Sequence, residues 1–502
     1  MIPRMAPEFL VPISAAVLFA LWIMCRKPKK FPPGPRRWPI FGYVPIIFAQ
    51  RAKDITSYLH KKYGRVVGLH VLNIPVVFIS GLDEVREALL RDDFSGRPEY
   101  INISIFGGKS SGIILTSGDI WKLQRRFVLQ HLRQLGLGKN TLEGIVQEEI
   151  RAMMIGIEEM SGGCENGYLY PVDFKALLGA VSINVLWHIV MGKRFDYRDP
   201  KFIQLMEAAK SIFNQNSQQI FFYNLFPFLA KLLPSSFGFQ EFESSVHCLH
   251  DAIEGEMDSH KEVIDYDHPQ DFMDIYLCEI EKQKDSLDRI FNVTQLKEVC
   301  AELFMAGTDT TTNNLSFAIL NMILYPRAQR KAQQEIDEVI GRDRLPSLSD
   351  RDRLPYVEAI IQEVLRLSSV APTAFPHSVV TSEKHVTFRG YHIPKGSVLI
   401  IDFYGVHHDP EIWKCPDMFI PERFLRKNGG DILNEAIYPF SGGKRGCPGE
   451  TFARNNIFLI LTSILQRYSL EVPEGQPLPS SDPIGNTVLF PKPFTVKVQR
   501  RF

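Results

Sequence analysis

Apolar residues recur at intervals of three and four along most of the chain, the spacing that places them on one face of a helix. The long patterns of this kind span Leu296 to Tyr325, Arg327 to Ile340, Pro355 to Ser368 and Glu450 to Tyr468. Pro326 is expected to stop the first helix, because proline cannot continue a helix, and Gly341 is placed to cap the second.

Runs typical of strands are few. They lie at 66–71 and 75–80, at 385–401, and in two closing segments at 486–490 and 494–498. Short runs of this kind between long helical patterns predict a mainly α fold with small β-sheets packed at one side.

The N-terminal part differs from the rest. Residues Phe9 to Cys25 carry no charge over about 17 positions, or roughly 26 Å as a helix, which is just enough to cross a bilayer. A basic cluster at 26–30 follows, and the positive-inside rule places it and everything after it on the cytosolic side. A cleaved signal peptide is the alternative, but the charges follow the apolar run and no small-residue cleavage site precedes them. We expect a retained membrane anchor with its basic flank at 1–30 and one catalytic domain at 31–502, joined by a stiff proline-rich spacer.

Composition narrows the class of protein. The 502 residues are 45% hydrophobic and 23% charged, so the chain is globular. The 57 acidic and 57 basic residues balance, which gives no overall attraction to nucleic acid. Seven cysteines without paired spacing do not form a disulfide framework, and the lack of any CxxC argues against a zinc ribbon and covalently attached haem.

One cysteine stands in an unusual setting. Cys447 follows a glycine-rich, basic stretch and directly precedes Pro448, which is expected in the first turn of a helix. Helix N-terminal amides, Lys444 and Arg445 would favour a thiolate there, although most free cysteines are structural. A thiolate so placed could be a nucleophile or a metal ligand, but no histidine is marked as its base. Since one cysteine cannot hold zinc or an iron–sulfur cluster alone, an axial ligand to haem iron remains.

The segment around this cysteine resembles a known family. Phe440, Gly443, Arg445, Cys447 and Gly449 match F-x-x-G-x-R-x-C-x-G, the haem-binding signature of cytochrome P450 enzymes. The resemblance extends over essentially the whole chain. It implies haem b with Cys447 as the axial thiolate, which donates electron density to iron and favours transfer of one oxygen atom of O2 to a substrate.

A second matching motif is a charged pair on the helix at 355–368. Glu363 and Arg366 lie at i and i+3, which elsewhere would be an exposed ion pair of little consequence. The resemblance implies that this E-x-x-R pair is buried with Arg423 of the P-E-R-F stretch, and that the three residues have a structural role near the haem.

A third motif is the polar stretch AGTDTTTNN at 306–314 within an apolar helix. Threonines can bond back to carbonyls one turn earlier, which together with Gly307 could open the helix to water and a diatomic ligand. The match to A-G-x-D-T-T implies that Asp309 and Thr310 deliver protons, that Ala306 lies beside the haem face, and that Gly307 makes room for oxygen.

The resemblance also implies which residues bind the haem propionates. Trp121 and Arg125 match W-x-x-x-R, although such a pair is more often amphipathic surface. Arg445 is expected to bind a propionate as well, and His377 stands where many animal members carry a His or Arg for this task.

Electrons are expected to come from a partner, because no G-x-G-x-x-G after a strand and no P-loop is present. For a microsomal member at the endoplasmic reticulum the partner is NADPH–cytochrome P450 reductase, with cytochrome b5 as a further candidate. The basic residues Arg126, Arg133, Lys444 and Arg454 could form the docking patch or a solvated charged face.

The substrate is the least determined feature. The segments that resemble pocket walls are apolar and rich in phenylalanine, which suits a lipophilic molecule: Ser104 to Ile114, Phe213 to Phe226, Leu303 to Thr310 and Val370 to Phe375. FSGRPEY and WKLQRRFVLQHL resemble the second animal clan, especially insect members near the methyl farnesoate epoxidases. The resemblance implies a terpenoid, steroid or xenobiotic substrate that we expect to be hydroxylated or epoxidised. The alternatives are a haem-thiolate isomerase or dehydratase that does not use O2, which often lacks the acid–threonine pair, and a non-catalytic haem-binding protein.

Overall fold

The computed structural model describes residues 27–39, 41–43, 52–98, 111–136, 142–160, 168–172, 174–214, 228, 232, 239–285 and 289–502. The predicted membrane anchor lies outside these residues. The chain divides into two compact units, and each is built from separate stretches of sequence. Unit 1 comprises the residues up to Pro98, Thr373–Val406 and Gly442–Arg445, and unit 2 comprises Glu99–Pro372, His407–Ser441 and Gly446–Phe502.

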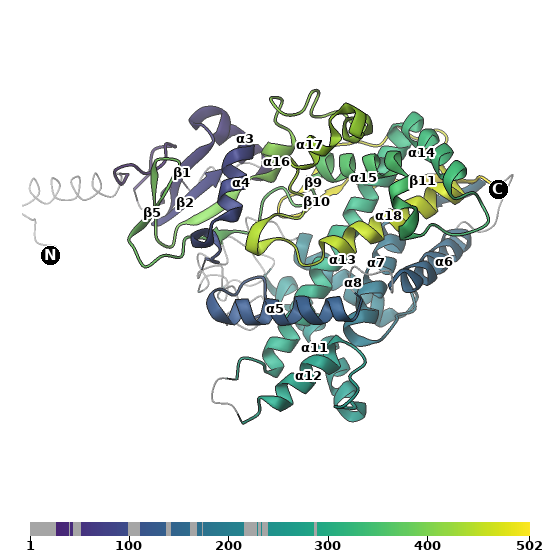
Figure 1. Cartoon of the computed structure of the whole chain (residues 1–502), viewed down its shortest axis with the longest axis horizontal. Coiled ribbons are helices and arrows are strands. Elements are labelled where there is room, and N and C mark those ends of the chain that lie inside the picture. The colour runs from purple at the N-terminus through teal and green to yellow at the C-terminus, as the bar shows by residue number, and fades with distance from the viewer. Residues whose placement is uncertain are drawn as a thin grey trace, which may run out of the picture. The chain divides into compact units, whose positions relative to one another are not determined.

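Unit 1 contains most of the predicted strands. Its elements are α3 (Ala52–Tyr63), β1 (Val66–Val71), β2 (Ile74–Ile79), α4 (Leu82–Leu90), η1 (Asp92–Phe94), β4 (His377–Ser378), β5 (His385–Phe388), β6 (Tyr391–Pro394), β7 (Val398–Ile401) and η9 (Gly443–Arg445) (Figure 1). Helix α16 (Phe403–His407) also belongs to it, except for His407, which is counted in unit 2. A four-stranded sheet has the order β1-β2-β7-β4, in which β2 and β7 are parallel. Strands β5 and β6 form a hairpin whose turn, Arg389 and Gly390, has positive φ at both positions, as a two-residue turn of type I′ requires.

Unit 2 is mainly helical. Its helices are α5 (Gly118–Gln134), α6 (Glu143–Met160), α7 (Phe174–Met191), α8 (Pro200–Asn214), α11 (Phe239–Val263), α12 (Phe272–Lys282), α13 (Val293–Leu324), α14 (Pro326–Val339), η6 (Leu348–Arg353), α15 (Pro355–Ser368), η7 (Pro421–Phe424), η8 (Arg426–Asn428), α17 (Gly430–Asn434) and α18 (Glu450–Arg467). Strands β3 (Tyr168–Val172), β11 (Val496–Arg500) and β8 (Tyr468–Glu471) form one small sheet, and β9 (Pro483–Gly485) pairs with β10 (Leu489–Pro491). The mainly α fold with small sheets is confirmed.

The long helical patterns predicted from the sequence are confirmed, with small shifts at their ends. Helix α15 has the predicted bounds, and α18 ends one residue earlier than predicted. Pro326 does more than stop α13, because it is the first residue of α14, where a missing N–H has no helical partner to lose. Gly341, with φ of 77°, donates its N–H to the Ile336 carbonyl at 3.2 Å and so caps α14 as expected.

Helix α13 is the centre of unit 2. It packs against α7, α11, α15 and α18, and its N-cap, Asn292, accepts a hydrogen bond from the Gln295 N–H at 3.0 Å. Helix α7 is long and apolar enough to cross a membrane, but most of its side chains are buried within the protein, as in the core helix of a globular protein. No other helix in the described ranges meets that test.

Candidate active site

The predicted ligand loop lies just ahead of α18. The first helical residue of α18 is Glu450, with Gly449 as its N-cap, so Pro448 is not in the first turn as expected but two residues before it. The N–H of Cys447 donates to the Phe440 carbonyl at 2.9 Å, which closes the loop. The Phe440 ring in turn lies under the Arg454 guanidinium, 4.9 Å from ring centre to carbon.

The sulfur of Cys447 is both accessible and desolvated. Part of the Cys447 side chain is exposed, yet burial among protein atoms raises the pKa of its thiol above the ordinary value. The Gly449 N–H, which hydrogen-bonds the sulfur, and the charge of Arg125 oppose this shift without overcoming it. The expected thiolate needs a cation at this position, such as a metal ion, which deprotonates a thiol that coordinates it.

The two signature glycines Gly443 and Gly449 lack a side chain for different physical reasons. Gly443 has φ of 61°, and a Cβ there would lie 1.9 Å from the carbonyl oxygen of Leu89, so no other residue fits. Gly449 has an ordinary φ of −96°, and a Cβ there would lie 3.9 Å from the Cys447 sulfur. A side chain at Gly449 would thus point toward the space beside the sulfur.

Two of the predicted propionate ligands lie on α5. Trp121 is buried with 4% of its surface exposed, and Arg125 lies one turn later on the same side of the helix. An Arg125 N–H donates to the backbone carbonyl of Gly446, next to Cys447. Arg125 is therefore held directly against the ligand loop, and its contact with a propionate stays a prediction.

The other predicted propionate ligands belong to unit 1, where they gather with an arginine that the sequence analysis did not select. Arg445 is buried and donates to the Ser95 carbonyl at 2.8 Å. The added residue, Arg97, is 9% exposed, stacks 5.3 Å above the Phe375 ring and donates to that residue's carbonyl at 3.0 Å. Its position in FSGRPEY was used only for the family resemblance, and nothing in the local pattern marked it as a ligand.

His377 fits its predicted role only conditionally. Its Nδ1 lies 2.7 Å from the Phe94 carbonyl oxygen, so Nδ1 carries the hydrogen and donates. Burial, followed by the charges of Arg97 and Arg445, lowers the pKa of His377 to about 3, so the ring is neutral and Nε2 is an acceptor. A carboxylate must first raise this pKa before Nε2 can donate to it.

The polar stretch of α13 presents an open face on a helix that is otherwise mostly buried. Ala306 is exposed, and Asp309 and Thr310 are partly exposed, while most residues before and after them are buried. The Thr310 hydroxyl donates to the Ala306 carbonyl at 2.7 Å, which is the back-bond predicted from the sequence. Burial raises the pKa of Asp309, and the charges of Lys175 and Lys210 partly offset that shift. Helix α13 remains α-helical throughout this stretch.

Gly307 lies against a neighbouring helix. A Cβ at this position would lie 2.4 Å from Cδ2 of Leu186 on α7, so Gly307 faces that helix. The missing side chain lets α13 and α7 approach closely, a role that the sequence analysis did not consider, and the role of Gly307 in making room for oxygen stays a prediction.

The buried charge network predicted around Arg366 is confirmed. Arg366 and Glu363 are completely buried and form two hydrogen bonds of 2.8 Å, and Arg423 Nε donates to the same carboxylate at 3.1 Å. Arg366 also donates to the carbonyls of His407 at 2.7 Å, Pro416 at 2.8 Å and Met418 at 3.3 Å. All five guanidinium N–H groups are thus used, as burial of this charge requires.

A further buried carboxylate was missed from the sequence. Glu302, one turn before Ala306 on α13, accepts the N–H of Ile113 at 2.6 Å and that of Ile114 at 3.0 Å. Gly112, just before them, has φ of 75° and no room for a Cβ beside this carboxylate. Burial raises the pKa of Glu302 to about 8. Glu302 thus ties the segment that precedes α5 to α13, and only its acidic type within an apolar run could have signalled it.

Much of the predicted substrate pocket lies outside the described residues. This applies to 104–110 and 215–226, whereas Leu303 to Thr310 and Val370 to Phe375 are described. A surface hollow lined by Tyr325, Lys331, Tyr356, Phe419 and Glu422, among others, contains none of the candidate site residues.

Comparison with known proteins shows the family of the chain. The sequence profile of the family described as Cytochrome P450 matches residues 32–498. Farnesoate epoxidase of Bombyx mori is 34% identical over 478 residues, covering 94% of each chain. Cytochrome P450 2J2 of Homo sapiens is 36% identical over 479 residues, covering 94% of this chain and 92% of the relative. Human cytochrome P450 2C8 is 36% identical over 463 residues, covering 91% and 92%.

The chain is a cytochrome P450. It is therefore an oxidoreductase of the monooxygenase type, whose cofactor is haem b with an axial cysteine thiolate. The residues of the P450 chain fit this group. Within unit 2, the desolvated sulfur of Cys447 suits an iron ligand, and Arg125, held beside it, suits a carboxylate of the porphyrin.

The predicted basic docking patch is only partly available in this P450. Arg126 and Arg133 are exposed on α5. Lys444 pairs with Asp92 at 2.7 Å, and Arg454 pairs with Glu450 at 2.9 Å. The first two arginines are therefore the better candidates for docking.

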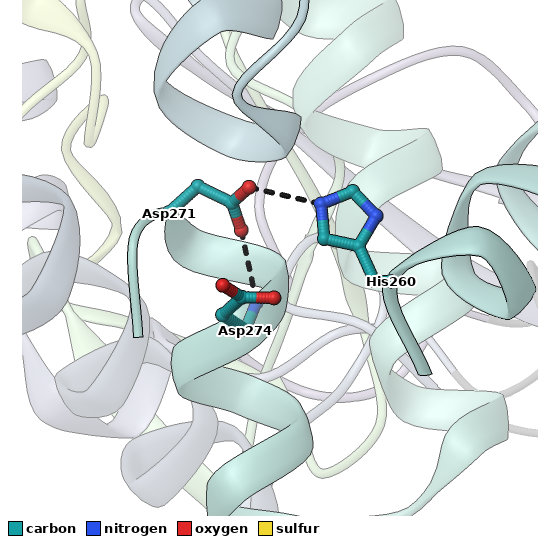
Figure 2. A group of neighbouring side chains, drawn as sticks. All are labelled: His260, Asp271 and Asp274. Carbon is teal, nitrogen blue, oxygen red and sulfur yellow. Dashed lines mark hydrogen bonds and ion pairs between the residues drawn. The ribbon is translucent and has the colours of Figure 1, made fainter. Parts of the chain in front are cut away.

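A second cluster offers possible metal ligands away from the haem residues. His260, Asp271 and Asp274 have ligand atoms within 4.8 Å of one another. Figure 2 shows His260 Nε2 pointing at Asp271 Oδ2, 2.9 Å away, while the other carboxylate oxygen accepts the Asp274 N–H as the N-cap of α12. His260 Nδ1 faces the Glu256 carbonyl at 2.7 Å. Since both ring nitrogens face acceptors, the ring is an imidazolium without a lone pair for a metal, and the cluster is an ion pair that joins α11 to α12.

The ligand loop should tolerate no side chain at Gly443. Gly475 is a matched control, because its φ of 77° is similar but nothing lies within 4 Å of a Cβ there. Gly475→Ala should lower the free energy of unfolding by about 1 kcal/mol through backbone strain, and Gly443→Ala by roughly 2–4 kcal/mol through the added clash. Denaturant unfolding followed by circular dichroism measures both. Equal losses would show that the Leu89 carbonyl does not restrict this position.

The ion pair of His260 should make stability depend on pH. Its hydrogen bond to Asp271 raises the pKa of His260 to about 8, above 6.5 for the unfolded chain. The contribution to the unfolding free energy is thus complete below pH 6.5 and is lost as pH rises through 8. On the order of 1 kcal/mol should be lost, after allowance for solvent screening, and His260→Gln should remove that slope. His268→Gln, at an exposed position nearby, is the control, and an unchanged slope in His260→Gln would contradict the ion pair.

Proposed function

We propose that this monooxygenase inserts one oxygen atom from O2 into a lipophilic small molecule, by hydroxylation or epoxidation. The observation that carries the proposal is the sulfur of Cys447, which is desolvated, lies beside Arg125 and is held by the signature loop. When bound, the haem supplies the activation of O2 and the transfer of one oxygen atom. The residues of the chain bind this group, exclude bulk water and move protons.

Cys447 is the proposed axial ligand. Trp121, Arg125, His377 and Arg445 are the proposed propionate ligands, and Arg97 joins them because it lies with His377 and Arg445. Arg125 and the Gly449 N–H stabilise negative charge on the sulfur. Phe440, Gly443 and Gly449 shape the loop, and Ala306 lies beside the cofactor face. Glu363, Arg366 and Arg423 hold the framework and take no part in the chemistry.

Asp309 and Thr310 are proposed to deliver protons. The Thr310 hydroxyl gives its hydrogen to the Ala306 carbonyl, so lone pairs of Oγ1 remain to accept a hydrogen bond on the open face of α13. Burial raises the pKa of Asp309 above the ordinary value for an aspartate, so this carboxyl holds a proton more readily than an exposed one. This pair supports oxygen chemistry over the two rivals, because neither a haem-thiolate isomerase nor a haem-binding protein needs it.

Electrons are proposed to come from NADPH through NADPH–cytochrome P450 reductase, with cytochrome b5 as a second donor. The sequence has no nucleotide-binding motif of its own, and Arg126 and Arg133 offer exposed positive charge on α5. We infer that residues 1–30 anchor the protein in the endoplasmic reticulum membrane and that the domain at 31–502 faces the cytosol, as the basic flank indicates.

A terpenoid is the proposed substrate class, ahead of steroids and xenobiotics. One relative that matches the chain over nearly its full length is a farnesoate epoxidase, and the described pocket segments are apolar. The names of the other relatives quoted above state no substrate, so the support comes from this relative alone.

Turnover with reductase and NADPH tests the function. Farnesoate and its methyl ester, fatty acids and steroids are supplied under labelled O2, and products are identified by mass. We expect a terpenoid product that carries one labelled oxygen atom. Cys447→Ala should lose both turnover and the red-shifted Soret band of the reduced, carbon-monoxide-bound protein. A product formed from a hydroperoxide without NADPH would establish the isomerase instead, and an unchanged Soret band in Cys447→Ala would refute this ligand.

Replacement of Thr310 tests proton delivery. Thr310→Ala should keep its haem but divert reducing equivalents to peroxide, with product per NADPH falling by roughly tenfold. Thr312→Ala is the matched control, because its hydroxyl makes the same back-bond, to Thr308 at 2.6 Å, but is buried. Product, peroxide and NADPH are measured together. Unchanged coupling in Thr310→Ala, or an equal loss in Thr312→Ala, would contradict the assignment.

A further inference from the structure

A buried histidine outside the predicted site connects the charge network to the ligand loop. His407, at the end of α16, has no exposed surface. Its Nδ1 lies 2.8 Å from the Ser369 hydroxyl, and its Nε2 lies 2.8 Å from the backbone nitrogen of Tyr438. Both ring nitrogens therefore have a partner, and each partner belongs to a different segment of unit 2.

The chemistry of the partners decides the state of the ring. A backbone N–H can only donate, so Nε2 accepts from Tyr438 and carries no hydrogen. Nδ1 then carries the hydrogen and donates to Ser369 Oγ, whose own hydrogen goes to the Arg366 carbonyl at 2.8 Å. Each donor in this series of hydrogen bonds has one acceptor, so the His407 ring is neutral and has its hydrogen on Nδ1. Burial agrees, because it lowers the pKa of His407 well below its ordinary value.

The backbone of His407 is held from the other side. Arg366 donates to its carbonyl at 2.7 Å, and Arg366 is itself fixed by the completely buried Glu363. The imidazole is thus attached to the completely buried Glu363–Arg366 pair, and its Nε2 presents a lone pair in a fixed direction.

Tyr438, whose N–H donates to this lone pair, lies just before the ligand loop in the sequence. Tyr438 stands two residues before Phe440, whose carbonyl accepts the N–H of Cys447 at 2.9 Å. The Tyr438 carbonyl also accepts the N–H of Ser441 at 3.2 Å, and Ser441 has φ of 62°, a strained value for a residue with a side chain. A shift of Tyr438 would therefore move the acceptor that orients Cys447.

We propose that His407 is a positioning residue for Cys447, which sets the ligand loop by accepting the Tyr438 N–H from a ring fixed against the Glu363–Arg366 pair. The inference rests on the proposed role of Cys447 as the axial ligand. It assigns to His407 no contact with haem, substrate or reacting atoms.

Four variants separate positioning from simple packing. His407→Leu removes the acceptor of the Tyr438 N–H, and His407→Gln supplies a side-chain oxygen that can replace it. His408→Leu is the same chemical change at the next, partly exposed position. Ser369→Ala keeps the ring but removes the group that holds the hydrogen on Nδ1, so it tests the proposal even if His407→Leu does not fold.

Two measurements are made on each variant at equal haem content. Amide hydrogen exchange at Tyr438 should quicken about tenfold in His407→Leu, the effect of one lost buried acceptor. The share of reduced, carbon-monoxide-bound protein with the red-shifted thiolate band should fall by at least about half. His407→Gln should recover both values, Ser369→Ala should lie between, and His408→Leu should match the unmodified protein.

The outcomes are distinguishable from failure of the proposed function. If Cys447→Ser keeps the thiolate band, the ligand assignment fails while exchange at Tyr438 still reports on the His407 bond. If Cys447→Ser loses the band and His407→Leu folds with both values unchanged, or His407→Gln does not recover them, the positioning role is refuted. Unchanged exchange and band share in Ser369→Ala would refute the fixed tautomer on which that role depends.

Discussion

The burial of one positive charge constrains much of unit 2. Removing a guanidinium from water is costly unless each N–H finds an acceptor, and Arg366 meets this condition with Glu363 and three backbone carbonyls. Those carbonyls belong to His407, Pro416 and Met418. Residues 408–418, which follow α16, form only turns and bends. The charge therefore organises an irregular stretch that helix or sheet hydrogen bonds could not. The ligand loop follows this stretch, and His407 connects the two.

The groups that are proposed to bind the cofactor are ionisable side chains removed from water. Burial disfavours the anionic form of Cys447, while arginines lie beside the loop and around His377. A desolvated thiol and buried cations are each unfavourable alone. A bound haem would supply a metal cation for the thiol and carboxylates for the arginines.

Local patterns predicted the features that depend on neighbours in the sequence. The bounds of α15, the cap at Gly341 and the back-bond of Thr310 follow from spacing and residue type. The signature around Cys447 predicted the haem-thiolate family, which the comparisons confirm. The assignment of individual site residues remains a prediction, although the buried network of Glu363, Arg366 and Arg423 has the contacts that the resemblance implies.

The features that the sequence analysis missed are fixed by distant segments. Gly307 faces Leu186 of α7, Glu302 holds the amides of Ile113 and Ile114, and His407 bonds Ser369 and Tyr438. Each pairing joins residues far apart in the chain, and no periodic pattern records it. The first-turn position expected for Pro448 was wrong for a similar reason, because the loop closure from Cys447 to Phe440 delays the start of α18.

The divided construction of unit 1 has a consequence for synthesis. Its sheet is complete only when β7 has been made. Its last segment, Gly442–Arg445, is made only when about nine tenths of the chain has been synthesised. The N-terminal strands therefore leave the ribosome long before their parallel partner exists, with an unpaired edge that can join other chains. The side of β2 that pairs with β7 thus stays exposed to other chains until the later segment has been made.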